Sequence, residues 1–166
     1  MIHALAMLLL AASAPADARA ITGAATAVSG DTLTIGSTRL RLEGIAAPRP
    51  MQHCRDGGGA TYPCGREAQA ALAGLVEGQA VRCALTGEGS GACTIAGRDI
   101  GADLIDRGIA VPSRRAASRR YERISARAAA ARRGIWRGQF VHPEQWDEAI
   151  RRNRFVRPSP PPAEGK

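Results

Sequence analysis

The sequence is poor in aromatic residues, in lysine and in long apolar runs, and each shortage argues against a class of protein. Aromatic residues make up only 4% of the 166 positions, which disfavours a surface that stacks successive single-stranded bases on aromatic rings. Lys166 is the only lysine, so the net charge of +8 comes almost wholly from arginine. Beyond the first 20 residues no segment has the ~20 apolar residues that span a bilayer, and we expect no transmembrane segment there.

The N-terminus carries the one extended apolar stretch. Residues 4–14 are largely apolar, and Ala18-Arg19-Ala20 fits the A-x-A pattern of a signal-peptidase site. A membrane anchor is the alternative, but the apolar run is too short for one. We therefore expect a signal peptide over residues 1–20, cleaved near Ala20, and a periplasmic or secreted protein.

Four cysteines, an even number, favour disulfides in an exported chain. Residues 80–96 read as a hairpin with a glycine-rich turn, which places Cys83 opposite Cys93. Cys54 and Cys64 then close the loop CRDGGGATYPC between them. A structural zinc site is the alternative, but the spacings lack a close C-x-x-C pair. The sequence thus predicts two disulfides.

Hydrophobic periodicity and turn residues give the order of the elements. Five strands are expected, three as a meander and two as the hairpin, together with three helices. The expected strands lie near 21–28, 32–35 and 38–43 and within the hairpin 80–96, and the helices near 66–77, 99–108 and 117–133. Asp99 is the expected N-cap of the second helix. This order indicates an α+β fold, a five-stranded OB-type barrel capped by helices.

The C-terminal end differs in composition from the rest of the chain. Residues 148–166 are basic and then proline-rich, a composition typical of disordered segments. We therefore expect one globular domain over residues 21–147, followed by a disordered tail.

Five short motifs occur in a specific order: SGDTLTI, RLRLEGIAAP, CGREAQAAL, GRDIGADLIDRGIA and ARAAAARRGIW. On these motifs the chain resembles the staphylococcal nuclease-like (thermonuclease) family over about residues 21–147. The resemblance implies a five-stranded OB-fold barrel with three helices. It also implies a calcium-dependent phosphodiesterase that acts on DNA and RNA as the ancestral activity.

The family's site residues carry over only in part. By resemblance, Asp31 matches a calcium-binding aspartate and Arg41 matches an arginine that contacts the phosphate. Ala46 stands where a second calcium-binding aspartate is expected, and Arg49 stands in place of the glutamate thought to act as general base. The hairpin turn TGEGSGA also lacks the family's second catalytic arginine.

These replacements predict a degenerate phosphodiesterase site, a pseudoenzyme. Calcium takes 6–8 oxygen ligands, so a single aspartate binds it weakly, and loss of a general base typically costs ~10²–10⁴-fold in rate. Two alternatives stay open. Glu43, on the strand face of Arg41, could rebuild a calcium site with Asp31. Asp31 could instead be an ordinary turn aspartate that hydrogen-bonds nearby backbone.

Arginines crowd the segment after the barrel. The candidate polyanion-binding residues are Arg114, Arg115, Arg119, Arg120, Arg123 and Arg127. On a helix they would wrap more than one face and form a broad positive surface, which binds polyanions without sequence preference. A solvated helix face is the alternative.

The expected function is therefore binding of nucleic acid or another polyanion by an exported protein. Calcium is expected as a cofactor only if the site is active. One alternative is an active calcium-dependent endonuclease with a rearranged site. The other is a non-enzymatic envelope protein that uses the fold for protein contacts.

Overall fold

The computed structural model describes residues 19–116 and 118–155. The expected signal peptide (apart from its last two residues) and the part of the tail after residue 155 lie outside the described residues. The strands are β1 (Ala20–Ser29), β2 (Thr32–Ile35), β3 (Thr38–Leu42), β4 (Ile45–Ala46), β5 (Cys54–Arg55), β6 (Thr61–Tyr62), β7 (Ala80–Gly87), β8 (Ser90–Ile95), β9 (Arg98–Asp99) and β10 (Val111–Pro112). The helices are α1 (Cys64–Val76), α2 (Ile100–Asp106), α3 (Arg119–Ala130), the 3₁₀ turn η1 (Gly134–Arg137) and α4 (Pro143–Phe155).

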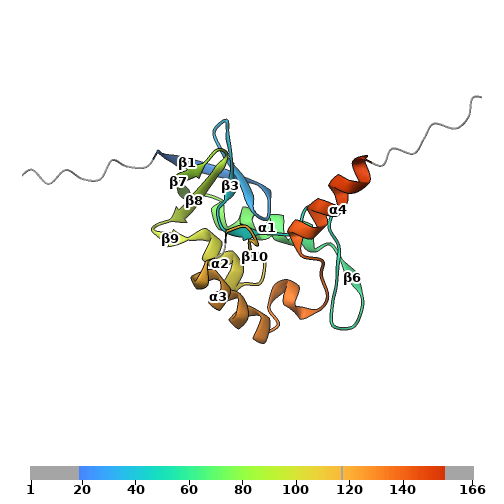
Figure 1. Ribbon diagram of the computed structural model, residues 1–166. Coiled ribbons are helices and arrows are strands. Elements are labelled where there is room, and N and C mark those ends of the chain that lie inside the picture. Colours follow the sequence, from blue (N-terminus) through green and yellow to red (C-terminus); the bar gives the residue numbers. More distant parts are fainter. Residues whose placement is uncertain (1–18, 117, 156–166) are drawn as a thin grey trace, which may run out of the picture.

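Five of the strands close into a barrel (Figure 1). β1 pairs antiparallel with β2 and β7, β2 with β3, and β7 with β8. The ring closes where β3 and β8 run parallel, with Arg41 opposite Ser90 and Leu42 opposite Gly91. The expected α+β fold with an OB-like five-stranded barrel is confirmed.

The barrel interior follows from the alternation of side chains along the strands. On β3, Leu40 and Leu42 point inward and are 2% exposed, while Arg39 is exposed and Arg41, between the two leucines, is half-buried. Leu33 of β2 and Val81 of β7 meet them in the main hydrophobic cluster. Full burial of each such side chain is worth about 1.5–3 kcal/mol, so this alternation fixes the register of the sheet.

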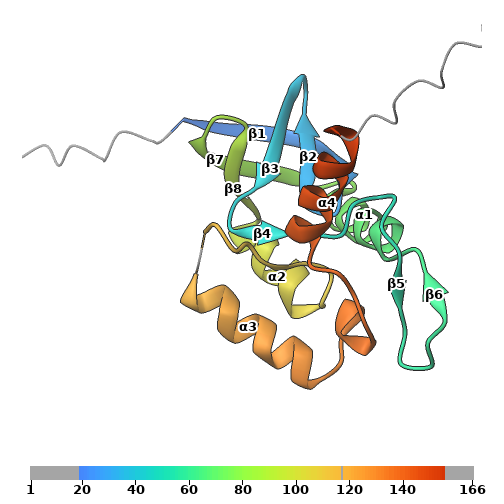
Figure 2. The same ribbon diagram turned by 45° about the vertical axis from the view of Figure 1, so that its right-hand side comes forward.

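Three helices cover the barrel as expected. α1 lies against β1 and buries Ala68, Leu72 and Val76, which are spaced by four residues and so share one face. The side chain of Asp99 accepts a hydrogen bond from the backbone of α2 and caps it, as predicted. α3 packs on α2, which also contacts α1, and Figure 2 shows α2 between the barrel and α3.

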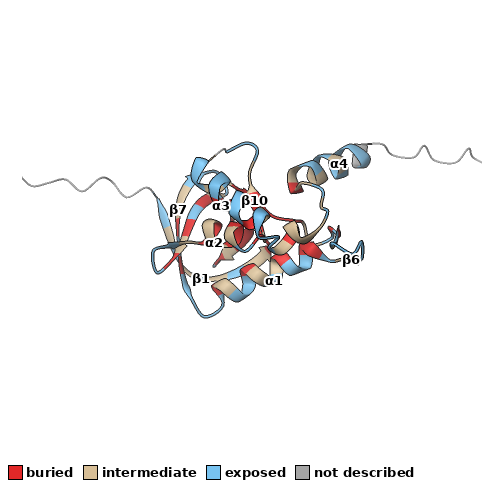
Figure 3. Ribbon diagram, turned by 90° about the horizontal axis from the view of Figure 1, so that it is seen from below, coloured by how far each residue is buried: buried red, intermediate tan, exposed pale blue. Residues whose placement is uncertain are grey.

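A fourth helix, α4, lies where a disordered tail was expected to begin. It continues to Phe155, so the prediction of disorder is wrong for residues 148–155. Pro143 suits the first helical position, Glu144 lies in the positive first turn, and the four-residue spacing of Asp147 and Arg151 favours a helix. Arginine content had suggested disorder, but arginine is also a good helix former. Figure 3 shows α4 as an arm at the edge of the molecule.

Both predicted disulfides are confirmed. Cys83 and Cys93 are directly opposite each other on β7 and β8 and are bonded. Cys54 of β5 is bonded to Cys64, the first residue of α1. In the part of the chain that the structure describes, no helix has the length and apolar character needed to cross a membrane.

Candidate functional site

The turn between β1 and β2 buries an aspartate completely. Asp31 is 0% exposed and its Oδ1 accepts hydrogen bonds from the hydroxyls of Ser29 (2.9 Å) and Thr32 (3.0 Å). Gly30 allows this burial, because a Cβ at that position would lie 2.6 Å from the Cβ of Ala68 on α1. The sequence Ser-Gly-Asp-Thr therefore supplies both the carboxylate and two of its hydrogen-bond donors.

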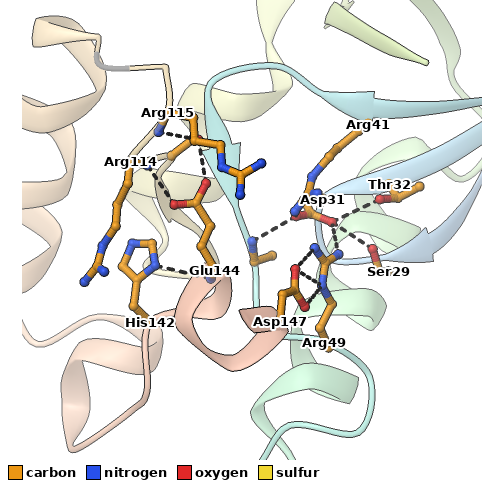
Figure 4. Close-up of polar contacts among 12 residues, drawn as sticks. Ser29, Asp31, Thr32, Arg41, Arg49, Arg114, Arg115, His142, Glu144 and Asp147 are labelled. Atoms are coloured by element: carbon orange, nitrogen blue, oxygen red, sulfur yellow. Dashed lines mark hydrogen bonds and ion pairs between the residues drawn. The ribbon is translucent and has the colours of Figure 1, made fainter. Parts of the chain in front are cut away.

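Two arginines complete the surroundings of Asp31 (Figure 4). Nη2 of Arg41 lies 3.0 Å from Oδ2, and Nη1 of Arg49 lies 3.1 Å from Oδ1. The backbone N–H of Ala47 donates a fifth hydrogen bond, 3.2 Å long, to Oδ2. An ordinary turn aspartate would accept from nearby backbone, whereas the nearby donors to Asp31 are hydroxyls and its backbone donor lies 16 residues further along the chain.

The electrostatic balance at Asp31 favours the charged carboxylate. Burial by itself raises the pKa of Asp31, but the guanidinium groups of Arg49 and Arg41, the backbone of Ala47 and the hydroxyl of Ser29 outweigh it. The pKa of Asp31 therefore lies below its ordinary value. The group stays ionised at neutral pH and is part of a permanent ion pair.

Arg49 bridges two carboxylates. Its Nη1 reaches Asp31, while its Nε lies 2.8 Å from Oδ1 of Asp147 on α4 and its Nη2 donates to Oδ2 of the same group. The hydrogen bonds to Asp147 are the main reason that the pKa of Arg49 is raised, and its side chain is only 22% exposed. The chain Asp31–Arg49–Asp147 thus joins the barrel to α4, and we call it the ion-pair chain.

The backbone of Arg49 is held as firmly as its side chain. The N–H of Gln52 donates to the carbonyl of Arg49 (2.7 Å), and the Gln52 side chain, 0% exposed, donates to the carbonyl of Val141 just before α4. Gly65 of α1 packs directly on this turn, because a Cβ there would lie 1.6 Å from the Arg49 carbonyl oxygen. The position of Arg49 is therefore fixed by the hydrogen bond from Gln52, by the close packing of Gly65 and by its own side-chain ion pairs.

A second carboxylate of α4 docks beside the first. Glu144 accepts hydrogen bonds from the hydroxyl of Ser113 (2.7 Å) and from the N–H of Arg114 (3.0 Å). Burial by itself raises the pKa of Glu144, but these hydrogen bonds outweigh it and the pKa lies below its ordinary value. Between the two carboxylates lies a cleft of about 130 Å³, lined by Arg41, Ile45, Ser113, Arg115, Glu144, Asp147 and Arg151.

The calcium ion that the family resemblance implies does not fit these residues. The carboxylate of Asp31 already accepts five hydrogen bonds, and two of the donors, Arg41 and Arg49, are cations that repel a metal. The guanidinium of Arg49 separates Asp31 from Asp147. Among the described residues no group of three or more His, Cys, Asp or Glu side chains could hold a metal ion.

Of the other predicted site positions, Ala46 lies next to Ala47, whose N–H donates to Asp31, whereas the side chain of Glu43 faces elsewhere. Glu43 is exposed and lines a different cleft together with Arg120 and Tyr121. Ala46 is 0% exposed and belongs to a second hydrophobic cluster with Val111. The position at which the resemblance implies a second metal-binding aspartate is thus occupied by a buried, apolar side chain.

The arginines of residues 114–127 fall into two groups. Arg120 pairs with Asp99, the capping residue of α2, and so stabilises the α2–α3 packing. The other five are exposed and have no ion-pair partner within the described residues: Arg114, Arg115, Arg119, Arg123 and Arg127. Arg119, Arg123 and Arg127 recur every four residues on α3, so they form one row along the helix.

Three residues of the site were missed from the sequence. Asp147 and Glu144 lay next to the expected tail, and Gln52 lay inside the segment that leads into the cysteine-closed loop. The one local signal was the Pro143-Glu144 pair, which is typical of the start of a helix.

No family model matches the chain. A search of curated proteins found a relative, the succinoglycan biosynthesis protein ExoI of Rhizobium meliloti (strain 1021). The two sequences are 36% identical over 145 residues, an alignment that covers 83% of this chain and 75% of the relative. At that identity and coverage, the chain belongs to the family of the succinoglycan biosynthesis protein ExoI.

Proposed function

We propose that this protein is an exported, staphylococcal nuclease-like domain that binds nucleic acid or another polyanion and has a degenerate phosphodiesterase site. The observation that carries the proposal is the ion-pair chain: a guanidinium group, that of Arg49, lies against Asp31 where the family would place a metal. A site built in this way attracts phosphate, but its two guanidinium groups repel a metal, and Arg49 replaces the glutamate that the resemblance implies as general base.

The binding half of the proposal rests on the five exposed arginines that have no ion-pair partner in the described part of the chain. A guanidinium fork matches the geometry of a phosphate or carboxylate group. Arg114 and Arg115 lie beside the cleft, and the row of Arg119, Arg123 and Arg127 extends the positive surface along α3. Such a surface binds by releasing counterions, so its affinity falls steeply as salt rises. The two disulfides suit an oxidising, extracytoplasmic compartment.

A second candidate ligand is an acidic glycan. The relative is named as a protein of succinoglycan biosynthesis, which supports a role near a polysaccharide. Carboxylates on a glycan present the same fork-matching oxygens as phosphates. In both cases the arginines carry the recognition, and the protein makes no chemical change.

The test is a paired assay on the oxidised protein with a fluorescent single-stranded oligothymidylate. Hydrolysis is followed with calcium and with chelator, and binding is followed by anisotropy over a salt titration. We expect no cleavage and binding that weakens steeply with salt. Calcium-dependent cleavage that disappears in Asp31→Ala would overturn the degenerate site and favour an active nuclease. An acidic polysaccharide that displaces the oligothymidylate, where a neutral polysaccharide does not, would support the glycan candidate.

A further inference from the structure

The attachment of α4 differs from that of the other helices. Apart from Pro143, every described side chain of α4 is half-buried or exposed, and none belongs to either hydrophobic cluster. Even Ile150, an aliphatic residue of this helix, is 39% exposed. Apart from the buried Pro143 and the half-buried Trp146, apolar burial therefore contributes less to holding this helix than it does for α1.

Polar contacts hold α4 instead, and its two docked side chains are both anions. Asp147 accepts hydrogen bonds from the guanidinium group of Arg49. Glu144 accepts hydrogen bonds from the hydroxyl of Ser113 and from the backbone N–H of Arg114. An oxyanion ligand would use these same donors, because a phosphate or carboxylate group accepts two parallel hydrogen bonds from a guanidinium.

The cleft under α4 would be strongly positive without these carboxylates. Arg41 of the barrel and Arg115 of the segment before α3 line it, and Arg49 lies directly behind Asp147, to which it donates. Among the described residues outside α4, Asp31 is the one carboxylate that pairs with Arg41 and Arg49. With Asp147 in place, the outer edge of the Arg49 fork is taken. With Asp147 withdrawn, that edge faces the cleft.

From these contacts we infer that α4 is an autoinhibitory arm, whose Asp147 and Glu144 compete with an oxyanion ligand for the arginine cleft. This inference rests on the proposed function, since it describes the regulation of the same positive surface. The apparent affinity for the ligand is proportional to the fraction of molecules in which the cleft is open. Weakening the contacts of the arm raises that fraction, and therefore raises affinity without adding any contact to the ligand.

The first experiment compares two variants that each remove one negative charge from α4. Asp147→Asn disrupts the contact with Arg49, whereas Glu148→Gln alters an exposed neighbour on the same helix. In the full oxidised chain we expect Asp147→Asn to bind fluorescent oligothymidylate at least about threefold more tightly than Glu148→Gln, as the open fraction grows. Equal gains in both variants would reduce the effect to net charge, and weaker binding by Asp147→Asn would also overturn the inference.

The second experiment uses the wild-type chain and needs no nucleic acid. Hydrogen exchange of the α4 amides is measured in inorganic phosphate and in sodium chloride of equal ionic strength. Phosphate is expected to speed exchange in α4 and to leave α1 unchanged, because the anion displaces the arm. Unchanged or slower exchange in α4 would contradict the inference.

The two proposals fail in different ways. If oligothymidylate binds but neither Asp147→Asn nor phosphate releases α4, the polyanion-binding function stands and the autoinhibitory arm does not. If no oligothymidylate binds to any variant while phosphate still releases α4, the arm stands and nucleic acid is excluded as its competitor.

Discussion

Arg49 and Arg123 are the same type of residue in opposite settings. Arg49 is mostly covered and lies between two carboxylates, at 3.1 Å from Asp31 and 2.8 Å from Asp147. Arg123 stands exposed on α3 with no ion pair in the described part of the chain. Arg49 neutralises carboxylates within the fold, whereas the charge of Arg123 is exposed to solvent and can contact a ligand. Net charge therefore overstates how much of the molecule is available to a ligand.

The comparison is tested most strongly by removing the buried charge. Asp31→Asn keeps the shape of the side chain but leaves Arg41 and Arg49 without their shared carboxylate. We expect a loss of about 3–5 kcal/mol in the free energy of unfolding, the usual result of breaking a buried pair. Urea denaturation measures it. Asp103→Asn, which breaks an exposed pair with Arg107, is the control and should cost less than about 1 kcal/mol. Similar losses in both would mean that burial at Asp31 adds nothing.

Acid should lower the free energy of unfolding, because it protonates the carboxylate of Asp31. The pKa of Asp31 in the folded protein lies below the ordinary value of 3.8, so its stabilising effect is fully present above that value. The effect is lost as pH falls through the lower, folded-state pKa. The stability gap between wild type and Asp31→Asn should therefore narrow between about pH 5 and pH 2. A gap that stays constant over this range would show that the carboxylate is not the source of the difference.

The exposed arginines should give the opposite pattern, a large change in binding and almost none in stability. The triple variant Arg119→Gln, Arg123→Gln, Arg127→Gln should bind oligothymidylate more weakly. Its salt slope should fall by about one for each arginine that no longer reaches a phosphate group. Its free energy of unfolding should stay within about 0.5 kcal/mol of wild type.

The matched control removes three exposed arginines from other elements, namely Arg55, Arg66 and Arg98. It changes net charge by the same amount. If the two triple variants bind equally, the row on α3 has no special role and only total charge matters.

The smallest expected effect is that of calcium. Since Arg49 already neutralises Asp31, added calcium has no buried carboxylate to bind, and a ligand that does not bind the folded state cannot stabilise it. The melting temperature of the oxidised protein should be the same in calcium and in chelator. A higher melting temperature in calcium would reveal a metal site, and would contradict the view that Arg49 fully occupies the buried carboxylate of Asp31.

Local pattern was enough to predict the barrel and its disulfides. The alternation of Leu40 and Leu42 with arginines fixes which face of β3 is inside, and the glycine-rich turn sets Cys83 opposite Cys93. These features depend on residues close in sequence, where period and turn chemistry are informative.

The candidate site could be predicted only on the side of β2 and β3. Asp31 and Arg41 were both identified and do meet. The partner of Arg49 was not, because Asp147 lies 98 residues away along the chain and no local pattern encodes such a contact. A composition-based prediction of disorder also hid α4, whose charged residues are helix formers as well as solubilising groups.

The start of α1 has a consequence for how the protein responds to reductants. Cys64 is tied to Cys54, and the next residue, Gly65, rests against the carbonyl of Arg49 with no room for a side chain. Opening this disulfide would remove one restraint on the first turn of α1, which packs against the backbone of Arg49. The thiol–disulfide balance of the surroundings should therefore influence the position of the Arg49 guanidinium, through the covalent bond that holds the start of α1.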